Sequence, residues 1–108
     1  MSHIKTRRSV RAYKSEPVPS KALDAVLEAG TCAPTGGGHQ SPIIIAITDP
    51  KYRRKIVKLN AEVMVSTTDP YYGAPVVILV LIDGSATTYV EDGSCVLENR
   101  MLAAHALG

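Results

Sequence analysis

The densest cluster of chemistry-bearing side chains is Arg7-Arg8-Ser9-Val10-Arg11, where three guanidinium groups and a hydroxyl lie within five residues. No acidic residue precedes Glu16 to neutralise this charge. A planar guanidinium presents paired N–H donors that match the paired oxygens of a phosphate. Taken alone, the stretch is either a phosphate-binding site or a solvated basic terminus.

A second unusual stretch spans residues 33–40 and reads Ala-Pro-Thr-Gly-Gly-Gly-His-Gln. Consecutive glycines lose much backbone entropy on ordering, so one interpretation is a flexible loop tip. The other is a backbone that passes very close to a flat ligand, where side chains would collide. The stretch is neither a GxGxxG dinucleotide loop, because Ser41 occupies the last glycine position, nor a P-loop, because no Gly-Lys-Ser/Thr follows.

Composition narrows the class of protein. The chain has 108 residues, 45% of them hydrophobic, with a net charge of +2, which suits a single domain over residues 1–108. Five of the twelve basic residues precede Ser15, yet the five tyrosines do not interleave with them, so we expect no nucleic-acid partner. The start is charged and the longest apolar run, 76–82, is too short to span a bilayer, so we expect no signal peptide and no membrane contact.

The cysteines and histidines show no pattern of a metal site. Cys32 and Cys95 form no CxxC, and the three histidines are far apart. Buried free cysteines are typical of a reducing compartment, so we expect a cytoplasmic protein without a metal. A thiol-redox role for Cys32 is disfavoured, because no cation lies near it in sequence.

These stretches need elements to position them, and the periodicity predicts five main ones. The sequence predicts a short helix up to about residue 9, an extended segment at 10–18, and loop over most of 61–75. Main helices are expected from the N-cap Ser20 to before Pro34, from the N-cap Asp49 with Pro50 at the first position, and from about Asp92 onward. Strands buried on both faces are expected at 43–48 and 76–82. This order predicts a sheet covered by helices, α/β or α+β.

Three helices show an apolar face at helical spacing. In the helix that follows Ser20 it comprises Leu23, Val26, Leu27 and Gly30. In the middle helix that face is Tyr52, Ile56 and Leu59. In the last helix an apolar stripe is interrupted by Arg100; its members are Val96, Leu97, Met101, Ala104 and Leu107. A buried unpaired guanidinium is costly, so Arg100 must find an acidic partner, reach solvent, or mark an odd feature of this chain.

The chain resembles the nitroreductase family of flavin-dependent NAD(P)H oxidoreductases, and the resemblance covers nearly its whole length. The matching stretches, in order, are Arg7-Arg8-Ser9-Val10-Arg11, Pro17-Val18-Pro19, Leu27-Glu28-Ala29 through Ala33-Pro34-Thr35, Gly73-Ala74-Pro75-Val76-Val77, and Glu98-Asn99 to Leu102-Ala103-Ala104-His105-Ala106-Leu107-Gly108. The resemblance implies an α+β homodimer that holds FMN at its subunit interface, with an incomplete central sheet in this chain.

The resemblance also implies roles for particular residues. Arg7, Arg8, Ser9 and Arg11 would bind the phosphate and neighbouring polar part of FMN. Pro34, Thr35 and Gly36 would come from the partner subunit and lie against the ring. The implied reaction moves a hydride from NADH or NADPH to the flavin and then to a nitro compound, a quinone or a similar small acceptor. No side chain need act as a catalytic residue, because the cofactor carries the chemistry.

The chain departs from the family pattern in several places. Gly38 stands where the family usually has Asn, Ser41-Pro42 where it has Pro-Trp, and Arg100 where it has an apolar residue. Members also continue into further strands and a basic residue near the phosphate, so we interpret the 108 residues as the N-terminal part of a longer protein. Two alternatives stay open: a flavin-binding module without turnover, and a non-enzymatic domain that binds anions or nucleic acid.

Overall fold

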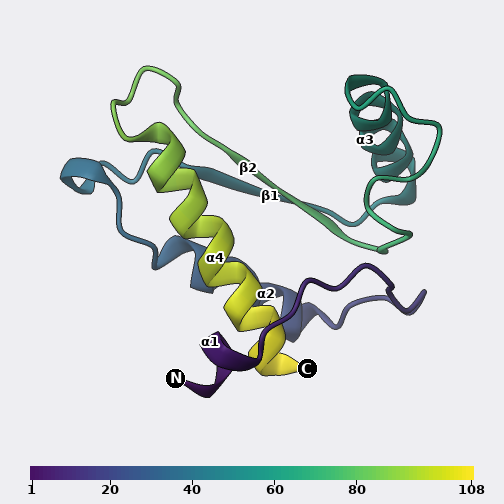
Figure 1. The fold of residues 1–108 in the computed structure, drawn as a ribbon, viewed down its shortest axis with the longest axis horizontal. Coiled ribbons are helices and arrows are strands. Elements are labelled where there is room, and N and C mark those ends of the chain that lie inside the picture. Colours follow the sequence, from purple (N-terminus) through teal and green to yellow (C-terminus); the bar gives the residue numbers. More distant parts are fainter. The chain divides into compact units, whose positions relative to one another are not determined.

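A computed structural model describes residues 1–108 and has the expected α+β composition (Figure 1). The elements in chain order are α1 (Ser2–Thr6), α2 (Ser20–Thr31), the 3-10 turn η1 (Gly36–Gly38), β1 (Ile43–Ile47), α3 (Pro50–Val63), β2 (Val77–Leu81) and α4 (Tyr89–Leu107). The chain divides into two compact units. The first comprises Met1–Arg8, Pro19–Ile45 and Leu79–Gly108, and the second Ser9–Val18 and Ala46–Ile78. The expectation of one domain stays a prediction.

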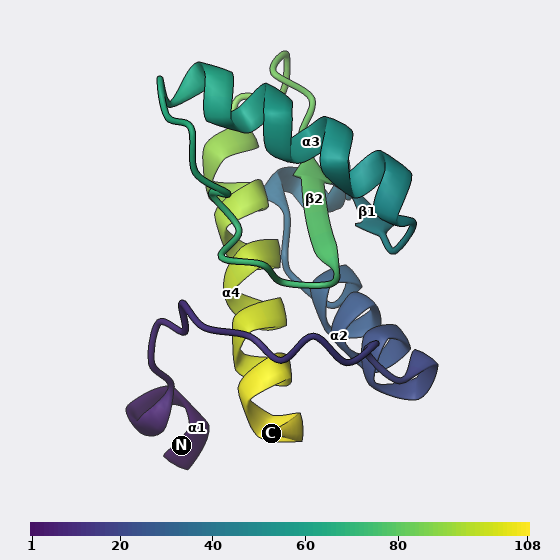
Figure 2. The same ribbon diagram turned by 90° about the vertical axis from the view of Figure 1, so that its right-hand side faces the viewer.

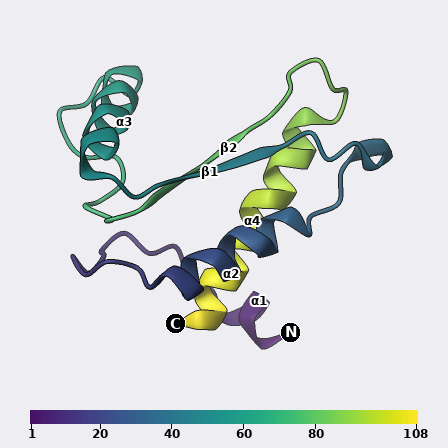
Figure 3. The ribbon, with the colours of Figure 1, turned by 180° about the vertical axis from the view of Figure 1, so that it is seen from behind.

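The sheet consists of β1 paired with β2 (Figure 3). Successive side chains of a strand point to opposite faces. Ile44 lies on the covered face, where it meets Gly30 of α2, whereas Ile43 and Ile45 are exposed. The prediction of burial on both faces was therefore wrong for β1. It was also wrong for β2, where Val77 is buried but Leu81 is exposed.

Helix α2 begins one residue earlier than its predicted cap implied. Pro19 is the N-cap, its carbonyl accepts from Leu23 N at 3.0 Å, and Ser20 is already helical without a side-chain cap bond. The prediction of Ser20 as the cap was wrong, since the fixed φ of Pro19 supplies the turn into the helix. The helix ends at Thr31, before Pro34 as predicted.

Helices α2 and α4 pack closely in the first unit (Figure 2). Gly30 makes this possible, because a Cβ there would lie 2.7 Å from Ile44 Cδ1 and 3.1 Å from Arg100 Cγ. Beside it, Asn99 Nδ2 donates to the carbonyl of Ala29 at 3.1 Å. A second glycine, Gly93 of α4, lies against Ile82, whose Cγ2 would be 2.9 Å from an added Cβ.

These glycine contacts decide which face of α4 is buried. Its buried residues are Asp92, Gly93, Val96 and Arg100. Of the predicted apolar stripe only Val96 is buried; the other four members, Leu97, Met101, Ala104 and Leu107, are exposed. The stripe prediction was wrong because α4 contacts Ile82 and Gly30 of α2 through the side that carries Gly93 and Arg100, not through its most apolar side. The helix also begins at Tyr89, before the predicted Asp92.

In the second unit, α3 begins as predicted. Asp49 is its N-cap, with Oδ1 accepting from Lys51 N at 2.8 Å, and Pro50 occupies the first helical position. Its predicted apolar face was partly wrong, since Tyr52 and Leu59 are exposed while Ala61 is buried. The helix extends to Val63, three residues into the segment predicted as mostly loop.

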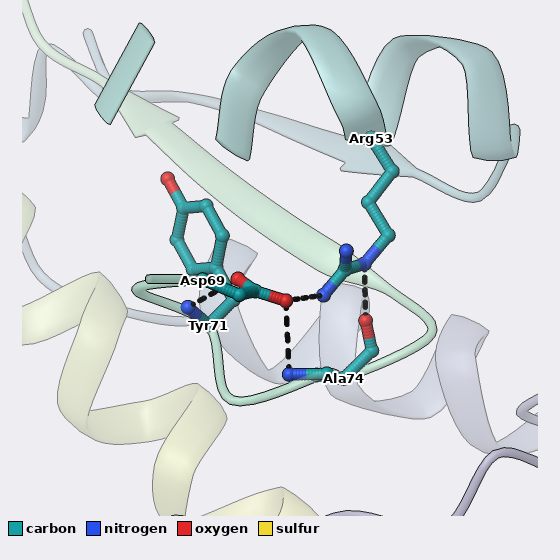
Figure 4. A network of polar contacts seen from close by, with 5 residues as sticks. Arg53, Asp69, Tyr71 and Ala74 are labelled. Atoms are coloured by element: carbon teal, nitrogen blue, oxygen red, sulfur yellow. Dashed lines mark hydrogen bonds and ion pairs between the residues drawn. The ribbon is translucent and has the colours of Figure 1, made fainter. Parts of the chain in front are cut away.

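The loop that follows α3 is held by one carboxylate (Figure 4). Asp69 Oδ2 pairs with Arg53 Nη2 at 2.8 Å and accepts from Gly73 N at 3.0 Å, while its Oδ1 accepts from Tyr71 N at 2.8 Å. Arg53 Nε also donates to the carbonyl of Ala74. The loop is thus ordered against α3 immediately before β2 begins.

Candidate cofactor-binding site

The predicted phosphate-binding residues lie where α1 ends. Arg8 folds back on the backbone, and its Nη1 donates to the carbonyls of Lys5 at 3.0 Å and Arg7 at 2.8 Å, so it satisfies carbonyl groups at the helix terminus. Arg7 is half-buried and belongs to the first unit, whereas Ser9 and Arg11 are exposed and belong to the second. Neither Arg7 nor Arg11 forms an ion pair, since the one ion pair of the chain joins Arg53 and Asp69.

Helix α1 is fixed against the C-terminal end of α4 (Figure 1). Thr6 Oγ1 and His105 Nε2 share a hydrogen bond of 2.8 Å. The rings of His3 and His105 meet edge to face, with centroids 5.7 Å apart. Because Arg7 directly follows α1, its backbone lies beside this end of α4.

The glycine-rich stretch forms a hydrogen-bonded turn. Thr35 Oγ1 accepts from Gln40 N at 2.8 Å, and the Thr35 carbonyl accepts from Gly38 N at 3.0 Å. Gly37 and Gly38 have φ values of 63° and 69°, in the left-handed region that glycine adopts without a Cβ penalty. The glycines therefore serve the turn itself, whatever lies against it.

The turn is attached to the N-terminal end of α4 by a buried carboxylate. Gly36 N donates to Asp92 Oδ1 at 3.0 Å, and Thr88 Oγ1 donates to Asp92 Oδ2 at 3.1 Å. Sequence reasoning missed Asp92, although a usable signal was present: it precedes Val96 by four residues and so lies on the buried side of the helix.

The two predicted halves of the site lie at opposite ends of α4. Asp92, which holds Gly36, and His105, which holds α1, are thirteen residues apart on this helix. At 1.5 Å of rise per residue, they are about 20 Å apart along the axis. Within one chain the structure therefore does not bring Arg7 and Arg8 together with the loop of Pro34, Thr35 and Gly36.

A pocket of about 260 Å³ opens beside the loop, within the first unit. Most of its lining residues are apolar, and three are polar, namely Thr31, Thr35 and Gln40. The lining residues are Leu27, Gly30, Thr31, Ala33, Thr35, Gln40, Pro42, Ile44 and Val96. Such a mostly apolar hollow with a few polar groups is typical of small-molecule sites.

Arg100 is buried beside α2 and is 8% exposed. Its Nε and Nη1 groups have no hydrogen-bond partner, and it finds no acidic partner in the chain. Burial disfavours the charged form and lowers the pKa of Arg100. Of the three outcomes expected for this residue, neither an acidic partner nor full exposure is observed.

The chain offers few other groups for a redox or metal site. Cys32 is exposed and Cys95 is half-buried, so the expectation that these free cysteines are buried was wrong. No group of three or more His, Cys, Asp or Glu side chains is arranged to hold a metal ion. None of the helices combines the length and apolar character needed to cross a membrane.

Comparison with known proteins identifies the family of the chain. The family model described as "Nitroreductase family" matches residues 4–108. A curated relative from Methanothermobacter thermautotrophicus, named "Putative NADH dehydrogenase/NAD(P)H nitroreductase", is 34% identical over 113 residues, which cover 97% of this chain and 54% of the relative. A relative of the same name from Archaeoglobus fulgidus is 30% identical and is covered to 60%. The chain thus spans little more than half the length of these relatives.

Solved structures agree in fold. A nitroreductase with bound FMN from Bacteroides fragilis has a TM-score of 0.89 at 29% identity, over 99% of this chain and 64% of that one. A nitroreductase with bound FMN from Desulfitobacterium hafniense has a TM-score of 0.88 at 25% identity, over 99% and 64%. The α+β arrangement is therefore the nitroreductase fold, and this chain belongs to the nitroreductase family.

Proposed function

We propose that the chain forms the FMN-binding part of a homodimeric NAD(P)H-dependent oxidoreductase. The observation that carries the proposal is the pair of unpaired arginines, Arg7 and Arg11, in a family of which the two solved members described above contain bound FMN. Two guanidinium groups close in sequence, with no carboxylate to neutralise them, fit the phosphate of that cofactor. Arg8 and Ser9 complete the proposed phosphate-binding stretch.

The loop supplies the proposed second contact. Its turn leaves Gly38 with no atom within 4 Å of where a Cβ would be, so a flat ring can approach the backbone on that side. Pro34 is exposed, and Thr35 lines the mostly apolar pocket. We infer that Pro34, Thr35 and Gly36 contact the ring, while Gly38 offers no side-chain amide at its edge.

The separation along α4 supports a homodimer. Since one chain carries Arg7 and its loop at opposite ends of this helix, a partner subunit is the simplest way to place a loop beside Arg7. The exposed side of α4 offers an apolar surface for that partner: Leu97 and Met101 are each 43% exposed and Leu107 is 55% exposed.

Bound FMN would accept a hydride from NADH or NADPH and deliver it to a small acceptor such as a nitro compound or a quinone. The protein side chains named above bind and orient the cofactor, and none is arranged as a nucleophile. The two free thiols suit a reducing compartment, so the proposed location is the cytoplasm.

The test is a visible absorption spectrum of the purified, desalted full chain, with the released cofactor identified by chromatography. Stoichiometric FMN that is bleached by NADH or NADPH, followed by acceptor-dependent turnover, is the expected result. Bound FMN without turnover would favour the flavin-binding module. A colourless protein that takes up no FMN but binds DNA in a salt-sensitive way would overturn the proposal in favour of the anion-binding domain.

A further inference from the structure

Asp92 is an ionisable side chain in an unusual place. It is 4% exposed, in the first turn of α4, and accepts one hydrogen bond from Gly36 N and one from Thr88 Oγ1. An ionised carboxylate is costly to bury unless donors surround it. The two donors and the positive end of the helix dipole offset that cost here.

The bonds of Asp92 do not serve to cap its own helix. Thr88 is the N-cap of α4, and its side chain makes no cap bond to the helix backbone; its hydroxyl is directed to Asp92 instead. The other oxygen reaches across 56 residues of sequence to the Gly36 N–H. The carboxylate therefore joins two separate elements, α4 and the glycine-rich turn.

The surroundings of Gly36 leave no room for a side chain at this position. A Cβ at this position would lie 2.1 Å from Thr88 Oγ1 and 2.9 Å from Thr88 Cγ2. Contacts below 3.0 Å essentially do not occur for real Cβ atoms, so a side chain at residue 36 would displace the loop. Asp92 thus attracts the Gly36 backbone from one side while Thr88 limits its approach.

We propose that Asp92 is a positioning residue that holds the loop Pro34-Thr35-Gly36 in the geometry that contacts the flavin ring. The inference rests on the proposed function, because the loop is a flavin contact only if the protein binds FMN. Asp92 itself touches no cofactor and acts through the Gly36 N–H. Release of this anchor lets the turn move away from the ring and weakens FMN binding without touching the phosphate contacts.

The first experiment compares Asp92→Ala with Asp92→Asn in the full chain, with FMN affinity measured by quenching of flavin fluorescence. Asn keeps an oxygen that accepts the Gly36 N–H, so D92N should bind FMN within about threefold of the unmodified protein. D92A lacks any acceptor and should bind roughly ten to a hundred times more weakly, the range for a lost hydrogen bond to a charged group. Equal weakening in both variants, or none in either, would overturn the proposal.

A second readout does not involve FMN. Amide hydrogen exchange of Gly36 in the cofactor-free protein should be slow in the unmodified chain and in D92N, and at least about tenfold faster in D92A. Fast exchange in the unmodified chain would contradict the anchor itself. Slow exchange in a protein that binds no FMN would support the hydrogen bond between Asp92 and Gly36 but refute the proposed function. Failure of the anchor and failure of the proposed function are therefore distinguishable.

A third experiment applies even if D92A does not fold: it adds a methyl group at residue 36 and removes the side chain of residue 88. Gly36→Ala should weaken FMN binding at least about tenfold, because the new methyl collides with Thr88. Glycine is tolerated at an N-cap, so Thr88→Gly makes room for the methyl and serves as its own single-variant control. The double variant G36A/T88G should bind FMN as tightly as T88G alone. If the double variant binds FMN as weakly as G36A, Thr88 does not limit the space at residue 36 and the proposal is overturned.

Discussion

Arg53 and Asp69 form the one ion pair of the chain, with Nη2 and Oδ2 2.8 Å apart (Figure 4). The same carboxylate accepts from the backbone of Tyr71 and Gly73, so a single side chain holds the loop between α3 and β2. Partial burial tends to raise the pKa of Asp69, but the hydrogen bonds from Arg53, Tyr71 and Gly73 outweigh it, and the net pKa lies below its usual range.

This shift predicts a pH-dependent stability. A carboxylate with a depressed folded pKa stabilises the fold above its unfolded pKa, about 3.9, and loses that contribution as the pH falls through the folded value. Asp69→Ala should therefore lower the free energy of unfolding by about 1.5–3 kcal/mol at pH 7. The difference from the unmodified chain should shrink below about pH 4, as measured by urea unfolding across pH.

Asp24→Ala is the matched control for Asp69, because Asp24 lies exposed on α2 and makes no ion pair. It should change the unfolding free energy by less than about 0.5 kcal/mol at either pH. A D69A effect of the same size at pH 7 and pH 3 would show that the ionised form contributes nothing.

Replacing Arg100 with Met should stabilise the protein. The buried Nε and Nη1 groups lack partners, and exchange of a buried charge for an apolar side chain of similar length removes that penalty. We expect a gain of about 1 kcal/mol or more in urea unfolding, whereas Arg54→Met on the exposed side of α3 should change little. Destabilisation by R100M would mean that Arg100 has an anionic partner in the assembled protein.

Gly30→Ala should loosen the contact between α2 and β1. The new methyl would lie 2.7 Å from Ile44 Cδ1, and overpacking of this kind costs about 1–3 kcal/mol. Ile44→Val removes that carbon, so the double variant G30A/I44V should be more stable than G30A in thermal unfolding. Gly84→Ala is the control, since its added methyl meets no atom within 4 Å. A G30A protein as stable as G84A would contradict the packing.

The arginine cluster should discriminate FMN from riboflavin, which lacks the phosphate. The double variant Arg7→Gln, Arg11→Gln should lose FMN affinity about tenfold or more, because charge-assisted bonds to the phosphate disappear. Riboflavin affinity should stay within about twofold. Arg54→Gln is the control, because it removes the same charge per site. If the affinities for FMN and riboflavin fall by the same factor, the two arginines do not bind the phosphate.

Local signals in the sequence were sufficient for much of the fold. The Asp49-Pro50 cap of α3, the end of α2 before Pro34 and the two β-branched strands were predicted and are confirmed within two residues. Each depends on bonds or conformational limits among a few neighbouring residues. The family was identified from five ordered motifs and is confirmed by the family model over residues 4–108.

The sequence by itself determined the local elements, the α+β class and the two stretches proposed to contact FMN. Only the tertiary structure decided which side of α4 is buried, because glycines on two elements permit an approach that hydrophobicity does not predict. It also decided that Asp92 anchors Gly36, a bond between residues 56 positions apart, and that Arg7 and the loop lie at opposite ends of one helix. Such contacts depend on how distant segments meet, which periodicity along the chain does not encode.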